Sequence, residues 1–536
     1  MVRPAPVRVF LACLCVLVGF FAGCATQDGI PPGAGSTAVG PGGRLPPADW
    51  RWLGRVGFGV DSAEAERLRV LGRRRFLDEQ LSLPPADPPA LAAAIAALPV
   101  AQQTAEQRWR AMRTEQQRIN TLPDEDSKQV ARNALNRAGN EAVLDTTRRH
   151  LLRALYSPAQ LREQMTWFWM NHFSVFSGKG SVRWTMGEYE ERAVRQHAFG
   201  RFRDLVMATA TSPAMLDYLD NAQSAANRVN ENYARELMEL HTLGVAGGPS
   251  GSSYTQQDVQ EFARILTGAG INANGLPPRL PPARQALYRT DGLFEFNPAR
   301  HDFGAKTLLG QRFEPAGFAE IEQAVALLCR QPATARFIST KLATYFVADE
   351  PPAALVERMA AVFQRTDGDI AAVLRVLFLS PEIDTAASAA AGGGGKFKDP
   401  VQFVVSSLRF AYEGRPVANL QPAIGWLNQL GEPLYGRVTP DGYPLTEAAW
   451  ASSGQMVRRF EIARAIGAGR SGLVPVPPAV PGIPAAAPEP PLRSSALFRD
   501  GIAPALGAAT RQALVQARSA QEWNTVLLSS PEWMQR

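Results

Sequence analysis

Apolar residues recur at spacings of three and four along most of the chain, a pattern typical of amphipathic helices. Alanine, leucine, arginine, glutamate and glutamine dominate these stretches, and alternating runs of β-branched residues are nearly absent. Several of the apolar stretches end in Ser-Pro, where the serine can cap the next helix and the proline suits its first turn. The pattern therefore predicts a mainly α protein, folded as a multi-helix globular body.

One segment breaks this helical pattern. Between Gly270 and Gly310 the chain is rich in glycine, proline and asparagine, and it carries two short apolar runs, at 293–296 and 306–310. Runs of this kind on either side of a 297–304 loop favour two short strands. We therefore expect a small β-hairpin-like insertion near 290–310.

Three stretches rich in glycine, proline or alanine divide the chain. Residues 24–48 are expected to form a flexible tether, residues 386–396 a Gly/Ala linker, and residues 474–491 a proline-rich loop. These breaks predict a helical main domain at 49–385. They also predict a C-terminal helical region at 397–536 that the proline-rich loop interrupts.

The start of the chain has the features of an export signal. Arg3 and Arg8 lead into the apolar run Val9–Phe21, about thirteen residues long, which is shorter than the roughly 20 that span a bilayer. The following Ala22-Gly23-Cys24 resembles the end of a bacterial lipobox, where a peptidase cuts before a cysteine that receives a lipid. We expect a lipoprotein signal peptide over 1–23, cleaved before Cys24. An ordinary secretory signal with an incidental cysteine is the alternative.

The cysteines and the distribution of charge limit where the protein can be located and what it can bind. Cys13 and Cys15 leave with the signal, so a disulfide framework is excluded, and Cys329 lies in an apolar run as a small buried hydrophobe. Ala25 rather than aspartate follows Cys24, so we expect an outer-membrane lipoprotein that faces the periplasm or the surface. The net charge is +6, but arginines interleave with acids along the chain, which does not indicate a nucleic-acid partner.

Common catalytic signatures are absent from the sequence. It contains no HExxH, CxxC, GxSxG or P-loop, and the GxGxxG at 467–472 follows a helical stretch rather than a strand, which argues against a dinucleotide site. The five histidines are more informative about a possible functional site. His150 follows two arginines and His197 lies in a charged helix, so both are predicted to be solvated.

His172 and His241 have denser surroundings. His172 shares a helix face with Phe168 and Trp169, which predicts either a core histidine bonded to a backbone carbonyl or a ligand or base at an aromatic pocket. His241 could join Glu236 in a metal site. On one straight helix counted from Asn230, however, His241 lies near 20° and Glu236 near 240°, so a site needs groups from other segments. A polar stripe that bonds neighbouring backbone is the alternative.

The irregular segment holds the remaining candidates. His301-Asp302 lies in the 297–304 loop, and Asp302 could accept from a ring nitrogen or bind a cation; a tight turn is the alternative. Asp258 follows Thr255, which can cap the helix 257–267. The catalytic candidates are His241, His301, Asp302 and Asp258. The candidate ligands of a divalent metal are His172, His241, His301, Asp302 and Glu236.

Together these segments resemble a bacterial family of uncharacterised proteins, the domain of unknown function 1800, from about Asp49 to Arg536. The resemblance implies an exported, mainly helical protein. It also implies a gene often encoded beside the domain of unknown function 1501, which is similar to sulfatases and alkaline phosphatases. No catalytic residue transfers. The segments that carry the resemblance are Trp169–Phe173, Asn230–Gly244, Tyr254–Val259, Ala263–Gly268, Phe296, His301–Lys306, Lys398–Val401 and Ser530–Glu532.

Two hypotheses about function follow. The first is an envelope protein, anchored to the membrane through a lipid on Cys24, that acts as accessory or interaction partner of a sulfatase-like protein on an extracytoplasmic polymer or its assembly. The second is a metal-dependent or acid–base enzyme with an inter-helix site built from His172, His241 and His301-Asp302, which requires these side chains to converge within about 10 Å. A purely structural envelope protein is a third possibility.

Overall fold

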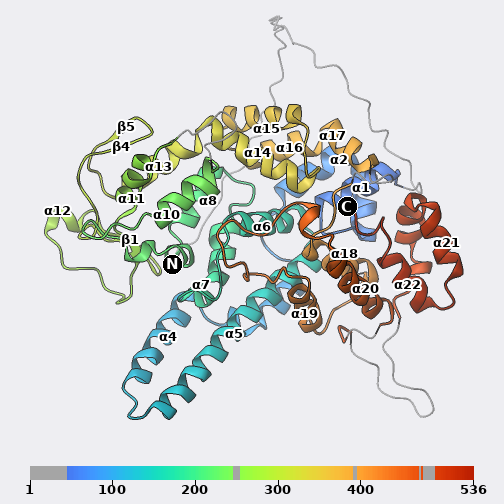
Figure 1. Cartoon of the computed structure of the whole chain (residues 1–536), viewed down its shortest axis with the longest axis horizontal. Helices are drawn as coiled ribbons and strands as arrows, with labels where there is room; N and C mark the ends of the chain where they lie inside the picture. The colour runs from blue at the N-terminus through green and yellow to red at the C-terminus, as the bar shows by residue number, and fades with distance from the viewer. Residues whose placement is uncertain (1–44, 246–253, 390–394, 414, 470–471, 475–488) are drawn as a thin grey trace, which may run out of the picture. The chain divides into compact units, whose positions relative to one another are not determined.

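Helices form most of the structure, and two small sheets complete it (Figure 1). The computed structural model describes residues 45–245, 254–389, 395–413, 415–469, 472–474 and 489–536. The prediction of a mainly α protein is confirmed. The predicted signal peptide and most of the predicted tether lie outside the described residues. Among the described residues, no helix is both long enough and apolar enough to span a membrane.

The described residues from Leu45 to Tyr218 are mostly helical. The long helices α4 and α5 lie side by side as a helical hairpin (Figure 1). Between α7 and α8 the backbone widens into a π-helix, η2 (Tyr189–Arg195). The α-helices are α1 (Pro47–Val56), α2 (Ser62–Ser82), α3 (Pro89–Ala96), α4 (Ala105–Asn120), α5 (Glu125–Tyr156), α6 (Gln160–His172), α7 (Val182–Glu188), α8 (Phe202–Ala210) and α9 (Pro213–Tyr218).

The second half continues in the same way. A second π-helix, η4 (Leu237–Thr242), directly follows α10. The helices are α10 (Asn232–Glu236), α11 (Gln256–Leu266), α12 (Pro282–Gln285), α13 (Phe318–Cys329), α14 (Pro332–Phe346), α15 (Ala353–Arg365), α16 (Ile370–Phe378), α17 (Pro381–Ala389), α18 (Pro400–Tyr412), α19 (Gln421–Gln429), α20 (Ser453–Gly467), α21 (Ala508–Gln516) and α22 (Ala520–Leu528). Helix α17 extends into the predicted linker, and residues on both sides of that linker belong to one compact unit.

The β-insertion, residues 269–313, contains both predicted strands, in two separate hairpins. Strand β3 (Phe294–Phe296) pairs with β2 (Arg289–Asp291) and, on its other edge, with β1 (Ala269–Ile271). Strand β4 (Lys306–Leu308) pairs with β5 (Gln311–Phe313). The expected strands are therefore present, but they do not pair with each other.

The Ser-Pro corners break the helices as predicted, and the predicted serine cap is present at only some of them: Ser530 accepts from the Trp533 amide at 3.2 Å. Helices α9 and α17 each begin at the proline of such a pair. Ser212 makes no side-chain cap bond, and the Ser380 hydroxyl donates back to the Leu377 carbonyl. The feature that the α9 and α17 corners share is therefore the fixed backbone angle of their proline. Cys329 ends α13 as a buried free thiol, as the sequence predicts.

Helix α6 is the centre of the hydrophobic core. Every residue from Gln160 to Met170 is buried, including four long or charged polar side chains. Gln164 accepts hydrogen bonds from the Tyr345 hydroxyl at 2.7 Å and from Gln402 at 2.6 Å, which joins α6 to α14 and α18. At its C-terminal end, Asn171 bonds the backbone of Tyr443 in both directions, so the loop after α19 closes over the helix.

One glycine allows that loop to approach so closely. Gly442 has φ of +76°, and a Cβ built on it would lie 2.1 Å from the Asn171 carbonyl oxygen. Gly310, in the β4–β5 turn, has nearly the same φ of +77° but nothing within 4 Å. The two positions therefore share the same backbone strain and differ in the space available.

We predict that Gly442→Ala destabilises the protein by about 3 kcal/mol, and Gly310→Ala by about 1 kcal/mol. In both variants the left-handed backbone of a non-glycine residue costs about 1–2 kcal/mol. Only Gly442→Ala also places a Cβ against the Asn171 backbone and forces the loop away from α6. Urea unfolding followed by circular dichroism measures the difference. Equal losses in the two variants would contradict the close packing of this loop on α6.

Candidate functional site

His172 and His241 lie side by side in a closed aromatic cluster. The Nε2 atom of His172 donates to the backbone carbonyl of His241 at 3.1 Å, as the core-histidine alternative predicts, and the two ring centroids are 5.9 Å apart. Both rings are buried, among Phe168, Phe173 and Phe337. Burial, followed by the nearby Lys341 charge, lowers the pKa of His241 to about 3 and holds the pKa of His172 well below its usual range. Both histidines are therefore neutral at pH 7.

The backbone around His241 differs from the straight helix that the sequence suggested. The helix begins at Asn232, and Asn230 lies outside it, accepting from the Asn232 amide. His241 lies in the π-helix η4, whose wider turns change its direction, so the projection from Asn230 is wrong. Neither ring nitrogen of His241 has a hydrogen-bond partner among the described residues. Short π-helical turns occur frequently at functional sites.

The described side chains around His172 and His241 do not form a complete set of metal ligands. Glu236 is half-buried, and burial followed by the charge of Glu239 raises its pKa. Among the described residues, no group of three or more His, Cys, Asp or Glu side chains could hold a metal ion. The divalent metal and the enzyme built on these histidines stay predictions.

His301 lies in a different, fully buried cluster. Its Nδ1 donates to the Thr267 carbonyl at 2.7 Å, and its Nε2 contacts a Glu320 carboxylate oxygen at 3.0 Å. The Lys306 ammonium donates to the other Glu320 oxygen at 2.6 Å, and the Ala316 amide also donates to Glu320. Both ring nitrogens of His301 are thus engaged. The cluster attaches the β-insertion to α13.

The two aspartate candidates lie beside this cluster and are also held in hydrogen bonds. Asp302 accepts from Arg264 on α11 at 2.8 Å, and this hydrogen bond lowers its pKa. Asp258 forms the capping box of α11 with Thr255 and accepts from the Leu309 amide at 2.7 Å. Both carboxylates therefore hold the insertion against α11. The structure brings His172 and His241 together and engages His301 and Asp302 elsewhere.

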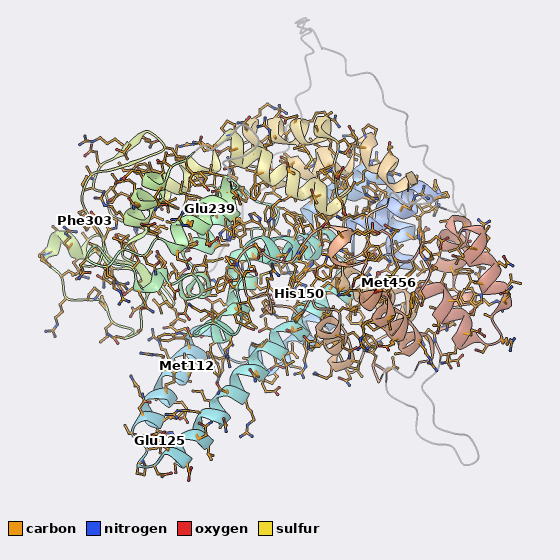
Figure 2. The ribbon with its side chains drawn as sticks, in the orientation of Figure 1. Met112, Glu125, His150, Glu239, Phe303 and Met456 are labelled. Atoms are coloured by element: carbon orange, nitrogen blue, oxygen red, sulfur yellow. The ribbon has the colours of Figure 1, made fainter. Side chains whose placement is uncertain are left out.

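His150 is buried, so the prediction that it is solvated is wrong. It lies on α5, close to α6 (Figure 2), and its Nδ1 is 2.7 Å from the Glu190 carboxylate. The Tyr435 hydroxyl donates to the other Glu190 oxygen. Burial opposes ionisation of Glu190, but the charges and hydrogen bonds of His150, Arg149 and Tyr435 lower its pKa to about 2. The sequence gives no local signal for these contacts, because His150 and Tyr435 are 40 and 245 residues away from Glu190.

Glu190 belongs to η2, and further buried ion pairs hold the inner side of this π-helix against α5 and α6. Arg195 forms a two-bond ion pair with Glu163 of α6, at 2.7 Å and 3.1 Å. Arg153 of α5 binds Asp87 at 2.8 Å and also pairs with Glu191. Charged side chains that look solvated in the sequence therefore turn inward. They hold η2 in one position on α5 and α6.

The outer face of η2 forms one wall of a groove of about 660 Å³, and the β-insertion forms the other. Arg192 crosses this groove to Asp291 at 3.2 Å, and both side chains are exposed. Tyr288 of the insertion and Phe318 at the start of α13 are half-buried aromatic residues of this second wall, and the Arg289 guanidinium lies 5.8 Å from the Phe318 ring centre. The polar lining near η2 also includes Glu188, which pairs with Arg192 at 3.2 Å, together with Gln196 and the half-buried His197. We call this the η2–insertion groove.

A family model described as "Protein of unknown function (DUF1800)" matches residues 51–535. The chain belongs to this family. The resemblance noted in the sequence is thus confirmed over nearly the whole chain. No curated protein and no solved structure matches this DUF1800 protein. Its functional site therefore has to be inferred from its own geometry.

We predict that Glu320→Gln destabilises this DUF1800 protein by about 3–5 kcal/mol, because it removes the carboxylate that pairs directly with the buried Lys306. The matched control is Glu314→Gln, which removes an exposed charge between β5 and α13 and should change stability by less than about 1 kcal/mol. Thermal unfolding at pH 7 compares the three proteins.

The same cluster predicts a pH dependence. Burial alone raises the pKa of Glu320, but hydrogen bonds from His301, Lys306 and backbone amides lower it to about 2. A carboxyl whose folded pKa is below its unfolded value of about 4.3 stabilises the fold above that value and loses this contribution as pH falls toward 2. Glu320→Gln should lack this part of the acid sensitivity. If the stability of Glu320→Gln fell with pH in parallel with that of the wild type, Glu320 would not be the source of this acid sensitivity.

Proposed function

We propose that this DUF1800 protein binds an extracytoplasmic polymer in the η2–insertion groove. In this proposal it is an exported envelope protein that acts as accessory or interaction partner of a sulfatase-like protein. The groove is the observation that supports binding: its volume of about 660 Å³ falls within the range of ligand sites, about 300–1,000 Å³. Its η2 wall rests on buried ion pairs, so little ordering accompanies binding.

The lining favours a polysaccharide. Aromatic side chains such as Tyr288 and Phe318 offer apolar ring faces to the flat faces of sugar rings. Guanidinium and amide groups, here Arg192, Arg289 and Gln196, donate hydrogen bonds to hydroxyl or sulfate oxygens. A sulfate ester would meet Arg289 and would compete with Asp291 and Glu188 for Arg192. It is also the group on which a sulfatase-like partner would act.

Export and lipid anchoring form the other half of the proposal. Their support is the N-terminal sequence: a short apolar run after Arg3 and Arg8, followed by Cys24 in a lipobox-like context. These residues lie outside the described part of the structure. A lipid on Cys24 would place the groove close to the polymers of the envelope.

We predict that the purified protein is retained by an insoluble sulfated polysaccharide, and that the double variant Arg192→Ala/Tyr288→Ala is retained at least tenfold more weakly. The variant removes one charge and one aromatic ring from opposite walls without entering the core. Arg458→Ala, an exposed arginine on α20, is the matched control and should bind like the wild type. Sedimentation binding isotherms on sulfated and desulfated material measure the effect. Equal binding by the double variant and the wild type would reject the groove.

We predict that a labelled fatty acid is incorporated into the wild-type chain in a bacterial host and not into Cys24→Ser, because only Cys24 follows the lipobox-like residues. Cys15→Ser, within the apolar run, should keep the label. Autoradiography of the immunoprecipitated protein gives the result. An exported but unlabelled wild type would establish the ordinary secretory signal instead.

The same cells test the partner. A sulfatase-like protein should co-purify with the wild-type chain from cross-linked native envelopes, and mass spectrometry identifies it. Envelopes that yield the anchored chain alone would remove the partner from the proposal and leave polymer binding to be judged by the isotherms.

A further inference from the structure

A second cavity, of about 130 Å³, is lined by α1, α18 and the C-terminal segment, and it shares no lining residue with the η2–insertion groove. Figure 1 shows the C-terminus close to α1 and α18. Three aromatic side chains, Trp50, Phe410 and Trp533, form much of its wall. The rest of the wall carries charge, from Arg51, Lys398 and Arg536 among others, so the cavity has both an apolar and a cationic side.

The cations of this cavity have spare donors. Lys398 is only 6% exposed, its ammonium forms no hydrogen bond or ion pair with the described residues, and it lies 4.0 Å from the centre of the Trp533 ring. Arg536 is 7% exposed, and its Nε and Nη1 are buried without a partner. The Nε of Arg51 is likewise buried and unpartnered. Three side chains of this cavity's wall thus carry N–H groups that no described residue uses.

The one acidic side chain of the cavity wall does not pair with these cations, and the nearby buried Asp399 and Glu432 face Arg459 and Arg536 rather than Lys398. Glu532 lies in the wall, but its two oxygens accept from the Gly507 amide at 2.6 Å and from the Thr510 hydroxyl at 2.8 Å. Burial, followed by the positive charges of Arg459 and Arg536, lowers the pKa of Lys398 to about 7. A buried amine without a counter-charge costs several kcal/mol, and a methionine would fill the same space without that cost.

We propose that this cavity binds a small organic carboxylate, with its carboxylate between Lys398 and Arg536 and its apolar body against Trp50, Phe410 and Trp533. The size fits a single ring, because an engineered protein cavity of about 150 Å³ holds benzene. A carboxylate supplies two acceptor oxygens for the spare donors, and charge-assisted hydrogen bonds of this kind are the strong ones. Benzoate is the simplest probe with these features.

Calorimetric titration of the full-length chain with benzoate tests the proposal. Benzyl alcohol, which keeps the ring and loses the charge, should bind at least tenfold more weakly. Lys398→Met should weaken benzoate binding at least tenfold, whereas Lys128→Met, which removes a lysine charge from α5, should leave it unchanged. Arg51→Met should weaken binding at least threefold, and it covers the case in which Lys398→Met does not fold.

The pH dependence separates a charged site from an apolar one. The charged groups around Lys398 are Arg51 on α1, Asp399 directly after it, Glu432 after α19, Arg459 on α20, and Glu532 and Arg536 in the C-terminal segment. Benzoate stays ionised from pH 6 to 9, so affinity should fall over this range as Lys398 loses its proton. The fall should vanish in Lys398→Met. Equal binding of benzoate and benzyl alcohol, undiminished binding by both variants, or no saturable binding would each overturn the proposal.

Discussion

The complete burial of α6 is the constraint on which the other elements depend. A helix enclosed on every side normally carries apolar residues, but this one carries Arg162, Glu163 and Gln164 in consecutive positions. Each buried polar group needs a partner, because an unpaired one costs about 1–3 kcal/mol or more. The partners come from several neighbours of α6: Leu83 after α2, Arg195 in η2, and Tyr345 in α14. The polar residues of one helix thus set where the surrounding elements lie.

This arrangement explains why the two candidate binding regions can coexist in one body. Glu163 fixes Arg195, and with it the π-helix whose outer face lines the η2–insertion groove. Gln164 bonds Gln402 on α18, and Gln402 lines the cavity that contains Lys398. The groove and the cavity share no lining residue, yet they rest on adjacent residues of the same helix. A change in α6 would disturb both regions together.

Much of the fold could be predicted from the sequence, but little of the candidate site could. Helical periodicity and Ser-Pro corners mark real helix boundaries, and the strands at 294–296 and 306–308 lie where the turn-rich segment indicated them. A charged residue, in contrast, has the same appearance in sequence whether it faces water or a buried partner. His150, after two arginines, therefore looked solvated. The π-helical turn at His241 also has no local signal, because an extra residue in a turn is fixed by the packing around it.

Cys329 has a practical consequence for experiments. It is the free thiol among the described residues, buried at the end of α13, and burial raises its pKa well above the usual value. Thiolate, not thiol, reacts with disulfides and maleimides, so this side chain is inert while α13 stays packed. Its rate of modification by an added reagent therefore measures how often the core opens. The native sequence provides an internal reporter of opening, at a position outside both the groove and the cavity.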